Sequence, residues 1–165
     1  MPPADALFVP DASWMELRDH LAKAIGGLAN GDVVLVDLPD LARRTSPRRG
    51  RLGRLLGTSH VMVAPWVRLQ RQDDHLRVEA LRGEARRGPG TRDRFPMSRE
   101  EADIIVGLGW HETRMEESGN YVRWWPDDVA GAAFLPDPEV HAAAEAVLRL
   151  LRETYGATPG QVRIG

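Results

Sequence analysis

The amino-acid sequence predicts an α+β fold in which helices pack on a mostly antiparallel sheet. Three observations support this class. The hydrophobic pattern changes along the chain from a helical period to strand alternation and back. Two alternating segments are joined by a polar turn, as in a hairpin. Strands and helices do not alternate regularly, as a parallel sheet would require. Because 165 residues suffice for one core, we expect a single domain over residues 1–165, with an arginine-rich insertion at about 41–58.

The first predicted elements are a helix and a buried strand. From Ser13 to Leu28 the apolar residues recur at steps of three and four, which places them on one face of a helix, and Asn30-Gly31 supplies a stop. The segment 33–36 is short and β-branched and is followed by Pro39. This composition favours a buried strand over a helix.

A hairpin is predicted after the insertion. Residues 61–69 alternate between apolar and mixed positions, and residues 76–81 alternate again after the polar turn 72–74. Pro65 interrupts the first of these strands. Since proline cannot donate a hydrogen bond to a neighbouring strand, we expect Pro65 at a sheet edge or a bulge.

The second half of the chain predicts helix, strand and long helix. Ser98, with Glu101 three residues later, is a capping box, and the helix that it opens stops at Gly109. Residues 120–125 are predicted to form a strand. Residues 137–156 are predicted to form a long amphipathic helix that begins with Asp-Pro and ends at glycine.

Four short motifs carry a family resemblance. They are Trp14 in the first helix, Val78-Glu79-Ala80-Leu81 at the end of the hairpin, the helix end Leu108-Gly109-Trp110, and Asn120-Tyr121-Val122-Arg123-Trp124-Trp125. In this order they resemble the TY-Chap domains of actinobacteria, which are related to the YbjN proteins and to type III secretion chaperones. The resemblance covers about residues 13–156. It departs at the arginine-rich insertion and at Pro65.

This resemblance implies a fold like that of YbjN and the type III secretion chaperones. It also implies a non-enzymatic protein that binds a peptide or protein client, forms a homodimer in many members and needs no cofactor. It offers no catalytic residues.

Aromatic residues are the candidates for partner binding. Trp124 and Trp125 are consecutive on a predicted strand, so their side chains must face opposite ways and one of them points away from the main core. Trp110, just past a helix-ending glycine, is expected in the core. The partner-binding hypothesis therefore names Trp66, Trp124, Trp125 and Tyr121. A sheet edge near Pro65 would accept an extended peptide by strand addition.

The alternative hypothesis is anion or nucleic-acid binding through two arginine-rich loops, 43–54 and 82–94. The first holds six arginines and no acid: Arg43, Arg44, Arg48, Arg49, Arg51 and Arg54. Clustered arginine neutralises phosphate. The rest of the chain is acidic, however, and no aromatic residue lies among these six arginines. Nucleic acid therefore ranks below a peptide as the expected partner.

Neither a metal site nor an active site is predicted. The chain has no cysteine, and none of its five histidines lies three to five residues from another. No serine has the Gly-x-Ser-x-Gly setting of a nucleophile. The chain has no long apolar run and lacks the features of a signal peptide, so we expect no membrane association and a cytoplasmic location.

Overall fold

The computed structural model describes residues 7–8, 13–44, 62–80, 84–87, 91–113, 119–126 and 135–165. Its helices are α1 (Trp14–Gly26), α2 (Arg99–Gly107) and α3 (Asp137–Tyr155), with short 3-10 turns at Pro39–Leu41 and Pro159–Gln161. Its strands are β1 (Leu7–Phe8), β2 (Val33–Asp37), β3 (Arg43–Arg44), β4 (Met62–Val63), β5 (Trp66–Gln72), β6 (His75–Ala80), β7 (Glu84–Arg87), β8 (Thr91–Arg94), β9 (His111–Glu112), β10 (Tyr121–Trp125) and β11 (Arg163–Ile164).

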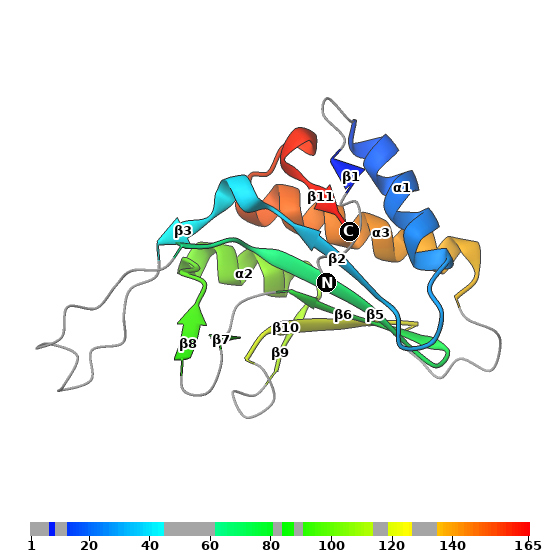
Figure 1. The fold of residues 1–165 in the computed structure, drawn as a ribbon, viewed down its shortest axis with the longest axis horizontal. Helices are drawn as coiled ribbons and strands as arrows, with labels where there is room; N and C mark the ends of the chain where they lie inside the picture. Colours follow the sequence, from blue (N-terminus) through cyan, green and yellow to red (C-terminus); the bar gives the residue numbers. More distant parts are fainter. Residues whose placement is uncertain are drawn as a thin grey trace, which may run out of the picture.

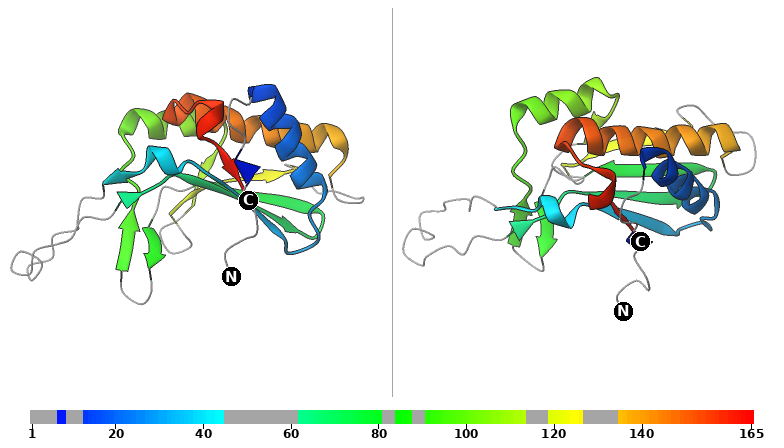
Figure 2. Two further views of the ribbon diagram at one scale, coloured as in Figure 1. Left: turned by 45° about the horizontal axis from the view of Figure 1, so that its top comes forward. Right: turned by 90° about the horizontal axis from the view of Figure 1, so that it is seen from above.

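Seven of the strands form one sheet, in the order β1-β11-β2-β5-β6-β10-β9 (Figure 1). All pairings in this sheet are antiparallel. The remaining strands form two small pairs, β3 with β4 and β7 with β8. Figure 1 and the left view of Figure 2 show α1, α2 and α3 on the same side of the large sheet. The predicted α+β class with a mostly antiparallel sheet is therefore confirmed.

The helix boundaries follow local signals in the sequence. α1 and α2 begin with capping boxes, Ser13 with Glu16 and Ser98 with Glu101, so the predicted box at Ser98 is confirmed. α3 ends at Gly156, whose φ of 64° is in the left-handed region that glycine adopts without strain. α1 ends at Gly26, before the expected stop at residues 30–31, because two consecutive glycines disfavour the helix there.

The predicted hairpin is formed by β5 and β6, but it is not at the edge of the sheet. β5 pairs with β6 on one side and with β2 on the other. Pro65 does interrupt the strand, since β4 ends at Val63 and β5 begins at Trp66. The expected edge position is wrong because β2 covers this side of the hairpin. The Pro65 carbonyl accepts a 3.1 Å hydrogen bond from the amide of Leu38.

The core lies between the sheet and the helices. Alternate residues of the central strands are buried, as strand geometry requires, and they pack with the apolar faces of the helices. The predicted faces of β5, β6 and α3 are confirmed by burial of Val67 and Leu69, of Leu76, Val78 and Ala80, and of Val140, Ala144, Val147, Leu148, Leu151 and Tyr155. The large sheet thus has one face against helices and one face turned away from them.

Candidate functional site

The face of the sheet that is turned away from the helices is called the outer face here. Register and strand alternation assign its residues: Val33, Leu35 and Asp37 on β2, Trp66, Arg68, Gln70 and Gln72 on β5, His75, Arg77 and Glu79 on β6, His111 on β9, and Val122 and Trp124 on β10. Half of the large exposed apolar side chains among the described residues belong to this face: Val33, Leu35 and Trp124.

The two consecutive tryptophans of β10 face opposite ways, as predicted. Trp125 is 4% exposed, and its ring packs edge-on against Trp110 at 6.2 Å between centroids. The guanidinium carbon of Arg123 lies 4.7 Å from the centre of the Trp125 ring. Trp124 is 38% exposed. The structure therefore assigns Trp125 to the core and Trp124 to the outer face.

Trp124 lines a hollow of about 400 Å³ together with His75, His111 and Pro126. This set is called the Trp124 hollow. The His75 ring meets the Trp124 ring edge-on, at 6.3 Å and 80°. Nδ1 of His75 lies 2.9 Å from a carboxylate oxygen of Asp74, in the turn that precedes β6. This contact fixes the imidazole beside the tryptophan.

A buried carboxylate organises the middle of the outer face. Glu79 is 6% exposed. One of its carboxylate oxygens accepts a 2.7 Å hydrogen bond from Arg77, and the other accepts a 2.8 Å hydrogen bond from the side-chain amide Nδ2 of Asn120. Because a buried carboxylate needs such partners, these bonds hold Arg77 in place on the sheet.

The other predicted partner-binding aromatics are placed differently. Tyr121 is 1% exposed and lies on the helix-covered face with Trp125, so neither is presented to a partner. Trp66 lies on the outer face opposite Asp37, half-buried against the core. On β5, the residue level with Trp124 is Gln70, and Trp66 lies four residues away from Gln70 on the same strand. Two strand spacings and four residues together separate Trp66 from Trp124 by roughly 16 Å. The two outer tryptophans therefore do not share one pocket.

Arg43, the first predicted basic-loop residue, is part of the internal packing. Its guanidinium donates hydrogen bonds to both carboxylate oxygens of Glu101 and, at 3.1 Å, to the carbonyl of Pro96. It also lies over the ring of Phe95, 5.0 Å from the centroid. The hydrogen bond to Glu101 raises the pKa of Arg43. Next to it, burial raises the pKa of the Tyr155 hydroxyl.

The remaining basic-loop residues divide into two groups. Arg44 is exposed on β3. Arg48, Arg49, Arg51 and Arg54 lie outside the described residues, as do the side chains of the predicted second loop, 82–94. The arginine-loop hypothesis thus rests on Arg44 and on residues that the structure does not describe, while Arg43 is occupied by Glu101.

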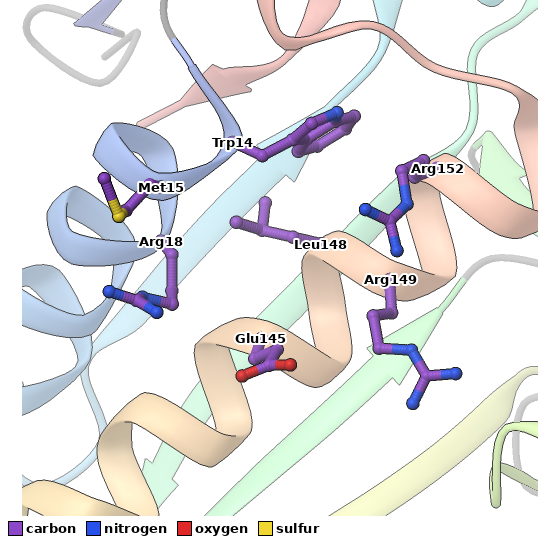
Figure 3. A pocket seen from close by; sticks show the side chains of 7 residues that line it. All are labelled: Trp14, Met15, Arg18, Glu145, Leu148, Arg149 and Arg152. Atoms are coloured by element: carbon purple, nitrogen blue, oxygen red, sulfur yellow. The ribbon is translucent and has the colours of Figure 1, made fainter.

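A further hollow, of about 230 Å³, lies between α1 and α3 (Figure 3). Trp14, Met15 and Leu148 supply its apolar surface, and in Figure 3 Leu148 reaches from α3 toward α1. Its lining arginines pair with neighbouring carboxylates: Arg18 with Asp19, and Arg149 and Arg152 with Glu153. Glu145 also lines this hollow, so its three arginines face three carboxylates and the hollow favours no particular ligand.

Another hollow, of about 500 Å³, extends from the segment before α2 toward β9 and β10. Phe95, Met97 and Val106 are among its lining residues, together with Tyr121, whose side chain is buried.

Sequence reasoning missed the histidines and the proline of the Trp124 hollow. His75 and His111 are 36 residues apart in the chain, and they line the same hollow because β6 and β9 both pair with β10. No local spacing signals such a pair. Among the described residues, no group of three or more His, Asp or Glu side chains could hold a metal ion.

Within the described ranges, no helix is both long and apolar enough to cross a bilayer.

Comparison with known proteins gives one family. No curated protein and no solved structure matches the chain. The model of the family TY-Chap3, described as T3SS (YopN, CesT) and YbjN peptide-binding chaperone 3, matches residues 9–161. This match covers almost the whole chain and confirms the resemblance to the TY-Chap domains. The chain therefore belongs to the TY-Chap3 family of peptide-binding chaperones.

Proposed function

We propose that this protein binds an extended segment of a client protein on the outer face of its sheet, with Trp124 as the anchor. The observation that carries the proposal is the exposed Trp124 in a hollow of about 400 Å³, on the face opposite the three helices. Tryptophan combines a large apolar surface with few rotatable bonds, so burying it against a partner is favourable at little entropic cost.

Capture of side chains on the sheet face fits this structure better than strand addition. The strand next to Pro65 is central, so it has no free edge for a peptide. The outermost strands of the described sheet, β1 and β9, have two residues each. Short edge strands offer few backbone hydrogen bonds to an added strand.

Four further points belong to this proposal. The protein acts by binding alone, without catalysis or a cofactor, in keeping with its membership of a chaperone family. Residues 1–165 form one domain. It assembles as a homodimer, which light scattering on the purified chain would test. A cytoplasmic location also stays a prediction, and cell fractionation would test it.

The test begins with peptides selected from a random library by the wild-type protein. Trp124→Ala is expected to stay folded and to weaken binding of the selected peptides about tenfold or more, as for a central interface tryptophan. Because the contact is apolar, the affinity should change little with salt concentration. Fluorescence anisotropy of labelled peptides gives the dissociation constants. Met15→Ala is the matched control, since Met15 is an exposed apolar residue on α1.

Two outcomes would overturn the proposal. One is unchanged peptide affinity in Trp124→Ala. The other is loss of binding when Arg48→Glu and Arg49→Glu are combined, together with a steep salt dependence, which would assign recognition to the arginine-rich insertion instead.

A further inference from the structure

The exposed apolar side chains of the outer face lie at two separate places. Val33 and Leu35, at the β2 end, are 41% and 39% exposed. Trp124, at the β10 end, is 38% exposed. Between them, β5 and β6 present polar side chains to the same face, apart from the half-buried Trp66 at the start of β5. A ligand that contacts both apolar places must cross the strands.

The sheet register fixes the distance between these places. Val33 is opposite Gln70, Gln70 is opposite Arg77, and Arg77 is opposite Trp124. Since neighbouring strands are about 4.8 Å apart, Val33 and Trp124 are three spacings or about 14 Å apart. In an extended peptide, side chains i and i+4 point the same way and are also separated by about 13–14 Å.

Val33, Gln70, Arg77 and Trp124 form one row across the sheet, and the two residues in its middle select the peptide side chain at i+2. That side chain would lie over Gln70 and Arg77, with Arg68 and Glu79 in the adjacent row. The Glu79 carboxylate is already bound by Arg77 and Asn120. A guanidinium carries five N–H donors, so Arg77 can donate to a ligand as well as to Glu79. In these two rows, Arg68 and Arg77 accompany a single carboxylate, that of Glu79, which is already hydrogen-bonded. This excess of positive charge favours an acidic side chain at i+2.

We propose that the outer face recognises an extended segment with apolar side chains at i and i+4 and an acidic side chain at i+2, lying across β2, β5, β6 and β10. The larger apolar side chain enters the Trp124 hollow and the smaller one covers Val33 and Leu35. The inference rests on the proposed function, because one of its two anchors is Trp124. The pattern is the same in both chain directions, so either orientation fits.

Synthetic peptides of one composition test the spacing. Each is a labelled Ser/Thr segment that carries one Phe, one Leu and one Glu, with the Glu as its only charged side chain. The Phe and Leu are four residues apart with Glu midway in the first peptide, and three or five apart in the others. The first peptide is expected to bind about tenfold more tightly, because at odd spacings the second apolar side chain points away from the sheet. Replacing its Glu by Lys is expected to weaken binding several-fold.

Protein variants test the β2 end independently of Trp124. Val33→Thr combined with Leu35→Thr keeps strand propensity at Val33 and removes apolar surface at both positions. This double variant should bind the Phe/Leu peptide several-fold more weakly, yet bind a peptide with Phe alone as the wild type does. Val106→Thr is the matched control, because Val106 is 55% exposed on α2, away from the outer face.

The outcomes separate this inference from the proposed function. Three outcomes would each overturn the pattern: equal affinity for all spacings, an unchanged affinity of the Val33→Thr/Leu35→Thr variant, or tighter binding of the Lys peptide. In each of these cases, loss of binding in Trp124→Ala would still support the proposed function. If Trp124→Ala binds every peptide as the wild type does, both proposals fail.

Discussion

Three tryptophans show how position in the fold decides the role of a residue. Trp110 is 1% exposed and packs edge-on against Trp125, which is 4% exposed, whereas Trp124 is 38% exposed. Trp124 and Trp125 are adjacent in sequence and belong to opposite faces of one strand. A buried aromatic ring supports the core, and an exposed one in a hollow is free to contact a partner.

Trp110→Ala is expected to lower the free energy of unfolding by about 3–5 kcal/mol, the range for removal of a buried aromatic side chain. Trp124→Ala should lower it by less than Trp110→Ala does, because part of the Trp124 side chain is already in solvent. Denaturant unfolding followed by circular dichroism measures both. A change for Trp110→Ala within experimental error would contradict its assignment to the core.

At the level of elements, the start of α2 is connected to β3 by one carboxylate. Glu101 accepts a 2.8 Å hydrogen bond from the backbone amide of Ser98, and it forms an ion pair with Arg43. Desolvation alone would raise the pKa of Glu101, but the hydrogen bonds from Arg43 and Ser98 and the charge of Arg43 lower it overall. The same group therefore caps a helix and attaches it to a strand.

This arrangement predicts a pH dependence. A carboxyl whose pKa is lowered by folding stabilises the protein above its unfolded pKa, about 4.3 for Glu, and this contribution is lost as the pH falls through the folded pKa. Glu101→Gln keeps a capping side chain but loses the charge. It should be less stable than the wild type by roughly 1–2 kcal/mol at neutral pH.

The stability difference between Glu101→Gln and the wild type should narrow as the pH falls below about 4. Free energies of unfolding measured across pH test this expectation. Glu100→Gln, an exposed neighbour in the same turn, is the control and should change stability little. A difference for Glu101→Gln that stays constant with pH would show that the charge of Glu101 is not responsible.

At the scale of the whole molecule, a late strand completes the sheet. β11 lies between β1 and β2 and pairs with both. Beyond it, the amide and carbonyl of Gly165 form hydrogen bonds of 2.9 and 2.8 Å with Leu35. β2 is thereby an internal strand, and the backbone beside its exposed Val33 and Leu35 side chains is partly paired.

A chain truncated after Val162 should be less stable and should form larger assemblies than the wild type, because it loses these pairings and leaves β2 with an unpaired edge next to exposed apolar side chains. Light scattering over a range of concentrations measures the association. Arg163→Ala keeps the backbone of β11 and should retain the association state of the wild type. If the truncated chain behaves as the wild type does, β11 does not protect the edge.

Sequence reasoning succeeded where near neighbours decide the structure. The capping box at Ser98, the glycine end of α3 and the alternating faces of β5 and β6 depend on residues within a few positions of one another. The same holds for the opposite orientations of Trp124 and Trp125. The four motifs were also enough to identify the family that the match over residues 9–161 confirms.

Tertiary structure decided whatever depends on pairing between distant segments. The central place of the hairpin beside Pro65 follows from its pairing with β2, and the exposure of Trp124 rather than Trp125 follows from the register between β10 and β6. The same pairings separate Trp66 from Trp124 and bring His75 and His111 into one hollow. A local hydrophobic period fixes that a strand has two faces, but only its partners, far away in the chain, decide which face is covered.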